Sequence, residues 1–176
     1  MFVESKLEDS LKIYFSSKTD KSIQNILTLK YRNKFVPEVG LGIFIKNNYQ
    51  ILEKKCVEDY ILYKIHFNII FYRFLRDEIL EGTVFLQNET GLFISIFFYD
   101  KIYVPIENLP DNSEITYIYD EKKNKKLSWV WNYKNNRFFI KTGEKIKFKV
   151  IKYDEENKIM LASLNESGLG PLTWWE

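Results

Sequence analysis

Cysteine and histidine are nearly absent from this chain, which has one of each among its 176 residues. A single cysteine, Cys56, excludes an intramolecular disulfide and any zinc site built from several thiolates. A single histidine, His66, excludes most histidine-based metal sites and leaves little basis for a Ser-His-Asp triad. We therefore expect no cofactor and no metal, and we expect Cys56 and His66 to have no catalytic role.

Glycine and proline are also scarce, at 7 and 4 residues, which argues against a disordered or collagen-like chain. None of the glycines has the spacing of a phosphate-binding loop, so we do not expect an enzyme. The most apolar run, residues 92–99, contains Ser95 and is far shorter than the roughly 20 residues of a membrane helix. No apolar block typical of a signal peptide lies near the N-terminus. We therefore expect a soluble intracellular protein without a membrane contact.

Hydrophobic residues make up 45% of the chain and aromatic residues 17%, enough to bury a core in one domain or two small ones. The net charge of +2 is unevenly distributed. Residues 122–149 contain ten lysines and arginines, and Glu144 is their one acidic residue. A concentrated basic stretch is typical of contact with RNA or DNA. The alternative is an ordinary solvated surface rich in lysine.

The first part of the chain, residues 1–78, predicts a small antiparallel sheet with one helix. Alternation predicts a strand over residues 7–15, irregular near residues 9–10, and apolar steps of three and four predict a helix that follows. Asp20 is the predicted N-cap of this helix, which should end before Pro37. Two further strands are expected, over residues 39–45 and 63–71.

The second part, residues 79–176, predicts only β-structure. Strands are expected over residues 82–86, 91–98, 101–105 and 145–150, with turns at residues 88–91 and 99–100. A hairpin is expected to pair residues 115–119 with residues 129–133. Several short strands separated by turns favour a small barrel, and a five-stranded OB fold fits the length. The predicted fold class is therefore α+β.

Three segments of the second part carry a functional signal: residues 82–84, 90–95 and 102–105. Their pattern resembles OB-type RNA-binding domains first known from ribosomal proteins. The resemblance implies that Phe93 is the second of two aromatic residues that stack on bases, while Thr90 stands where the first is expected and Pro105 where a histidine is common. The alternative is that Phe93 packs inside the barrel.

Three lysines share one face of the strand over residues 145–150. Lys145, Lys147 and Lys149 alternate with apolar residues, so all three are expected to face water. Together with Phe93 they predict a charged track with one stacking platform, suited to weak and sequence-tolerant RNA contact. The alternative is that the lysines only solvate the strand.

A broader resemblance covers nearly the whole chain. Its matching segments are residues 1–3, 36–45, 64–82, 97–102, 129–131 and 142–144. They resemble the larger stalk subunit of archaeal and eukaryotic RNA polymerases, a family built from a tip domain and an OB barrel. Trp129-Val130-Trp131 and the segment Gly168–Trp175 resemble the RNA polymerase III version. Where the family usually has a Gly-Asp-Gly-type loop, this chain has Cys56–Tyr60.

The resemblance implies a non-catalytic, nuclear subunit of RNA polymerase III. Its partners would be the small helical stalk subunit in a heterodimer, the polymerase III core, initiation factors and, weakly, nascent RNA. It would support initiation on tRNA and 5S rRNA genes. Residues 1–78 would dock on the core, and the candidate docking residues are Val39, Gly40, Trp174 and Trp175. The alternatives are the stalk subunit of another nuclear polymerase and a free-standing OB-fold RNA-binding protein.

Overall fold

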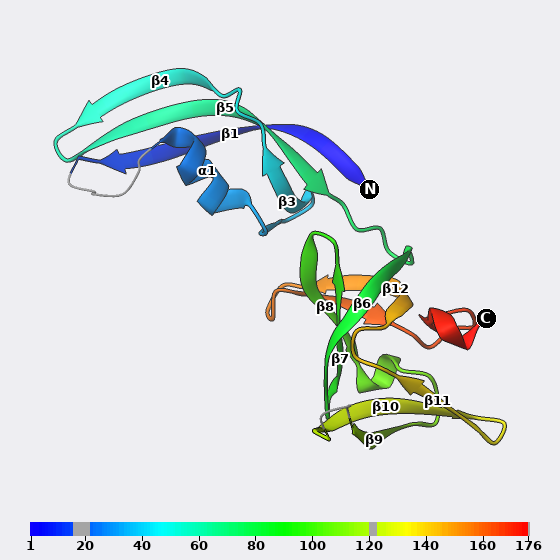
Figure 1. Ribbon diagram of the computed structural model, residues 1–176. Helices are drawn as coiled ribbons and strands as arrows, with labels where there is room; N and C mark the ends of the chain where they lie inside the picture. Colours follow the sequence, from blue (N-terminus) through cyan, green and yellow to red (C-terminus); the bar gives the residue numbers. More distant parts are fainter. Residues whose placement is uncertain (16–21, 120–122, 176) are drawn as a thin grey trace. The chain divides into compact units, whose positions relative to one another are not determined.

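The computed structural model describes residues 1–15, 22–119 and 123–175 (Figure 1). The chain divides into two compact units, Met1–Phe74 and Leu75–Glu176. This division lies slightly before the boundary at residues 78 and 79 that the sequence suggests. Each unit has its own sheet system and is described separately.

The first unit is an antiparallel sheet organised around one long central strand, β5. Its elements are β1 (Phe2–Tyr14), α1 (Ile23–Tyr31), β2 (Phe35–Val36), β3 (Gly40–Ile45), β4 (Gln50–Val57) and β5 (Tyr60–Tyr72). β1 pairs with one edge of β5 along its whole length. β3 and β4 share the other edge, and β2 extends the sheet beyond β3. The prediction of a small antiparallel sheet with one helix is confirmed.

Helix α1 covers one face of this sheet (Figure 1). The Ser22 hydroxyl accepts a hydrogen bond from the Asn25 backbone N–H at 3.2 Å and caps the helix. The predicted cap, Asp20, lies outside the described residues. The helix ends at Tyr31, before Pro37 as predicted. Two helix residues, Ile23 and Leu27, form the core together with the sheet residues Leu11, Ile45, Ile65, Phe67, Ile69 and Phe71.

The predicted irregularity of the first strand near Asp9 is wrong, because β1 pairs with β5 without a register shift. Asp9 faces the helix side of the sheet and has partners there. Its carboxylate accepts hydrogen bonds from the Lys30 ammonium at 2.6 Å and from the Tyr31 hydroxyl at 2.9 Å. Burial and then this hydrogen bond raise the pKa of Tyr31. Two donors from α1 therefore make a carboxylate acceptable in a regular strand.

The second unit contains a closed five-stranded barrel. Its strands are β6 (Ile79–Asn88), β7 (Gly91–Ile96), β8 (Tyr99–Pro105), β12 (Lys145–Asp154) and β13 (Ile159–Ser163). Neighbouring strands pair in the cyclic order β6, β7, β8, β13, β12 and back to β6, with only β8 and β13 parallel. This is the topology of an OB fold, as predicted. Short elements complete the unit: η1 (Ile106–Asn108), β14 (Gly170–Pro171), which pairs with β12, and η2 (Leu172–Trp174).

Alternating residues of the strands fill the barrel. Ile146, Phe148 and Val150 of β12 are buried as predicted, and so are Leu92 and Ile94 of β7. The predicted turn at residues 99–100 is wrong, because the chain turns at residues 97–98 and residue 96 pairs with residue 99. The ring at position 99 is only 7% exposed, so this tyrosine opens β8 and contributes to the core.

A three-stranded antiparallel sheet is inserted between β8 and β12. It consists of β9 (Ser113–Tyr119), β10 (Lys125–Tyr133) and β11 (Asn136–Ile140), with β10 in the middle. The predicted hairpin of β9 and β10 is confirmed. Trp129 of β10 is 2% exposed, and its indole N–H donates to the carbonyls of Asn88 and Gly91 at 3.0 and 3.2 Å. Trp129 thus joins the inserted sheet to the β6–β7 turn of the barrel.

Candidate nucleic-acid interface

Three aromatic rings lie together on the outer face of the barrel. Phe93 stands between the buried Leu92 and Ile94, so its side chain points outward from β7. Its ring centroid is 4.7 Å from that of Tyr103 on β8 and 6.1 Å from that of Phe85 on β6. The alternative that Phe93 packs inside the barrel is wrong. We call Phe85, Phe93 and Tyr103 the aromatic strip.

The aromatic strip contains two residues that the sequence analysis missed. Phe85 is 43% exposed. Tyr103 donates its hydroxyl to the backbone carbonyl of Thr90 at 2.6 Å and lies 2.9 Å from the Thr90 hydroxyl. Thr90 occupies the position where a stacking aromatic residue was expected, so Tyr103 supplies a ring next to that position from the neighbouring strand. Alternation with the buried residues 102 and 104 was the available signal.

The three candidate lysines lie on the outer face of β12, but their environments differ. Lys145 is exposed. The Lys147 ammonium lies 3.7 Å from a carboxylate oxygen of Glu81. Lys149 is the most covered, at 20% exposure, and contacts both Glu166 and Asp77. The hydrogen bond to Glu166 holds the pKa of Lys149 above its ordinary value. The positive charge available to a phosphate therefore decreases from Lys145 to Lys149.

The pairing register places Lys145 near the aromatic strip. Lys145 is opposite Thr83 on β6, and Thr83 is opposite Ser95 on β7. Phe93 is two residues from Ser95 on the same face. Strand spacings of about 4.8 Å and a rise of about 3.3 Å per residue put Lys145 and Phe93 about 12 Å apart. The other two lysines lie farther along β12, away from the strip.

The other described basic residues between positions 122 and 149 lie on several strands and turns. They are distributed over β10, β11, β12 and their connections. The Lys125 ammonium lies 3.9 Å from the centroid of the Tyr117 ring, and Arg137 pairs with Glu114 at 3.2 Å. Tyr117 and Glu114 therefore already contact two of these positive charges. Lys145 is exposed, which makes it the best candidate for a contact with RNA.

Val39 and Gly40 have local structural roles. The carbonyl of Val39 accepts a hydrogen bond from the Arg73 guanidinium at 3.3 Å, and its side chain packs on the core of the first unit. Gly40 has a φ of +131°, and a Cβ there would lie 2.6 Å from the Tyr72 carbonyl oxygen. Glycine is therefore required for this close approach of two strands. Docking on a polymerase core through these two residues stays a prediction.

The two tryptophans near the C-terminus pack on the second unit. The Trp174 ring lies 5.4 Å from that of Trp131 and 5.8 Å from that of Phe138, and its indole N–H donates to the Phe139 carbonyl at 3.2 Å. Trp175 is 47% exposed, and its indole N–H donates to the Leu169 carbonyl at 3.0 Å. Trp174 therefore packs on the inserted sheet, and docking through either tryptophan stays a prediction.

Deleting residues 172–176 should destabilise the second unit. The deletion removes the Trp174 ring from its contacts with Trp131 and Phe138. We expect the free energy of unfolding to fall by about 2 kcal/mol, the usual contribution of a large side chain that is mostly buried. Urea unfolding followed by far-ultraviolet circular dichroism measures the change. An unchanged midpoint would mean that the C-terminal contacts contribute nothing to stability.

His66 lies on β5 and Cys56 on β4 of the first unit. The His66 ring lies 2.8 Å from the Glu8 carboxylate, which also pairs with Lys64 at 3.0 Å, and Cys56 is exposed. The hydrogen bonds from Lys64 and His66 lower the pKa of Glu8.

Within residues 1–15, 22–119 and 123–175, no group of three acidic, histidine or cysteine side chains could hold a metal ion. No helix in these ranges is long and apolar enough to cross a bilayer.

Comparison with known proteins finds relatives among the subunits of RNA polymerase III. Residues 78–159 match the model of RNA polymerase III subunit Rpc25. The chain is 27% identical to DNA-directed RNA polymerase III subunit RPC8 of Bos taurus, over 99% of this chain and 98% of that protein. The second unit of this chain therefore resembles the Rpc25 family of RNA polymerase III subunits. The prediction of the RNA polymerase III version of the stalk subunit is thereby confirmed.

Two relatives from yeasts also match both units of the chain. The RPC8 subunit of Schizosaccharomyces pombe is 24% identical over the full length of both chains. The subunit of Saccharomyces cerevisiae is 24% identical over 85% of this chain and 71% of that protein. Both units of the fold therefore lie within the matched region, although the Rpc25 family model itself matches only the barrel unit.

Proposed function

We propose that this chain is the larger stalk subunit of an RNA polymerase III and that it acts by binding rather than by catalysis. The observation that carries the proposal is the match to curated RNA polymerase III subunits along both units of the chain. The closed five-stranded barrel supports it, because such barrels bind single-stranded nucleic acid on an outer face. No chemical step of RNA synthesis is assigned to its residues.

The barrel is proposed to contact the emerging transcript. The aromatic strip offers faces on which bases of any identity can stack, and Lys145 offers a phosphate contact about 12 Å away. This arrangement supports weak and sequence-tolerant binding. In the cell, the subunit would work in the nucleus and support transcription of tRNA and 5S rRNA genes together with initiation factors.

The first unit is proposed to dock on the polymerase core, and the small helical stalk subunit is proposed as the heterodimer partner. Large apolar side chains on the first unit are well exposed: Phe2, Tyr14, Phe15, Leu29, Phe44, Ile51 and Leu52. Exposed apolar side chains of this size are available for burial in a protein interface. Co-expression with the small subunit should give a soluble 1:1 complex with an interface of about 2,000 Å² or more. Equal solubility of the chain alone, with no gain in melting temperature on mixing, would contradict this prediction.

Affinity purification of the tagged full chain from its own cells tests the proposed function. Mass spectrometry should identify the large polymerase III subunits and the small stalk subunit in stoichiometric amounts. Recovery of subunits specific to another nuclear polymerase would favour the first alternative. Recovery of the chain with RNA and no polymerase subunit would favour a free-standing RNA-binding protein.

A further inference from the structure

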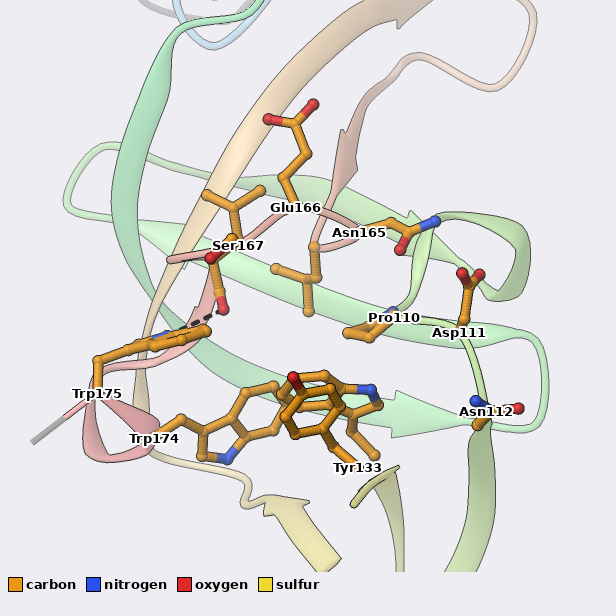
Figure 2. A pocket seen from close by; sticks show the side chains of 12 residues that line it. Pro110, Asp111, Asn112, Tyr133, Asn165, Glu166, Ser167, Trp174 and Trp175 are labelled. Atoms are coloured by element: carbon orange, nitrogen blue, oxygen red, sulfur yellow. Dashed lines mark hydrogen bonds between the residues drawn. The ribbon is translucent and has the colours of Figure 1, made fainter. Parts of the chain in front are cut away.

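A pocket of about 470 Å³ opens in the second unit, between the inserted sheet and the segment that leads to the C-terminus. Figure 2 shows Tyr133 and Trp174 along the floor of the pocket, with Glu166 and Ser167 on the opposite side. This pocket is separate from the aromatic strip, since it shares no residue with Phe85, Phe93 and Tyr103. The proposed RNA contact does not use it, but two of the candidate docking residues, Trp174 and Trp175, line it.

The floor of the pocket is a row of nearly parallel aromatic rings. Tyr133 stacks on Trp131 with centroids 4.9 Å apart and planes 25° apart. Trp131 in turn lies 5.4 Å from Trp174 with planes 31° apart. Trp131 thus contacts both Tyr133 and Trp174, and the three rings form one aromatic surface in the pocket. Aromatic-lined grooves of this kind bind proline-rich segments, which lose little entropy on binding.

The rim of the pocket is acidic. Asp111 and Glu166 are the charged residues among those that line it, and no lysine or arginine is among them. Lys149 pairs with Glu166, and the Lys134 ammonium lies 5.1 Å from the centroid of the Tyr133 ring, so the negative charge open to a partner is centred on the exposed Asp111. Carboxylates beside aromatic faces suit an arginine, because a guanidinium both stacks on rings and pairs with carboxylates. The same carboxylates would repel the phosphates of RNA.

We propose that this pocket docks an extended, proline-containing segment of a partner protein that carries an arginine. The prolines lie across Tyr133, Trp131 and Trp174, and the arginine reaches Asp111 at the rim. The proposal depends neither on RNA binding by the barrel nor on assembly into a polymerase, so its failure would leave the proposed function intact.

The test uses the full chain and a fluorescein-labelled peptide of repeated Pro-Pro-Arg triplets, with binding followed by fluorescence anisotropy. Tyr133→Ala should weaken binding roughly tenfold, because it removes the half-exposed end of the aromatic floor. Asp111→Asn should weaken binding about threefold and reduce its dependence on salt. Asp111 is a surface side chain, so this variant keeps the test informative if Tyr133→Ala disturbs the fold.

Two matched variants and two other probes complete the design. Tyr119→Ala removes a more exposed tyrosine of the same inserted sheet, and Asp100→Asn removes a carboxylate from an exposed position of β8. Neither residue lines the pocket, so peptide binding should be unchanged in both. Equal binding of a Pro-Pro-Glu peptide would overturn the proposal, as would no binding of the Pro-Pro-Arg peptide up to about 1 mM. Oligouridylate that competes with the peptide and loses affinity in Tyr133→Ala would overturn it in favour of an RNA site.

Discussion

Trp129→Ala should lower the free energy of unfolding of the second unit by about 4 kcal/mol. Replacement of a buried tryptophan by alanine typically costs about 3–5 kcal/mol, because burial is lost and a cavity remains. Trp129 is 2% exposed. Its indole N–H also serves the Asn88 and Gly91 carbonyls at both ends of the β6–β7 turn, and alanine leaves both without this donor.

Urea unfolding measures this loss, and intrinsic fluorescence is a selective signal because all four tryptophans lie in the second unit. Trp129→Phe should lose about half as much, since it retains most of the volume but not the donor. Trp175→Ala is the control, because its ring is 47% exposed. A loss below about 1 kcal/mol for Trp129→Ala would mean that this side chain does not hold the inserted sheet on the barrel.

Strands with one buried face could be predicted from the sequence. Apolar and polar residues alternate in the middle of β5 and over most of β12, and the buried apolar residues there are Ile65, Phe67, Ile69, Ile146, Phe148 and Val150. In contrast, β4 was not predicted, because every residue of this strand is exposed and burial imposes no alternation on it. Its position depends on pairing with β5, which is a tertiary contact.

Two errors have the same physical origin. The sequence predicts an irregularity at Asp9, but two hydrogen bonds satisfy the Asp9 carboxylate within a regular strand. Their donors, Lys30 and Tyr31, lie more than 20 residues away on α1, so the local sequence does not show them. Asp100 appeared to form a turn, although the burial of Tyr99 draws this part of the chain into β8. In both cases, a distant contact outweighs the local preference of a polar residue.

The candidate RNA site was only partly visible in the sequence. The resemblance to RNA-binding barrels identified Phe93, but Phe85 and Tyr103 become its neighbours only when three strands pair. The different environments of the three lysines could not be predicted from the sequence either. Lys149 meets Glu166 because the segment after β13 passes beside β12, and strand alternation contains no information about that contact.

The second large effect is expected in RNA binding. Phe93→Ala should weaken binding of a fluorescein-labelled oligouridylate roughly 5- to 150-fold, since stacking of one base contributes about 1–3 kcal/mol. Phe93 is the central ring of the aromatic strip, so its loss also separates Phe85 from Tyr103. The slope of log affinity against log salt should stay unchanged, because stacking releases no counterions. Phe44→Ala is the control, because Phe44 is an exposed ring on β3 of the first unit.

The lysines should affect the salt slope unequally. Lys145→Ser should reduce the slope by about 0.7, the value for one phosphate contact on a single strand. Lys149→Ser should reduce it much less, because Glu166 and Asp77 already compensate that charge. Lys6→Ser, on an exposed position of β1, controls for net charge. Equal reductions for Lys145 and Lys149 would mean that RNA displaces the carboxylates from Lys149, and no reduction for either would leave this face without a phosphate contact.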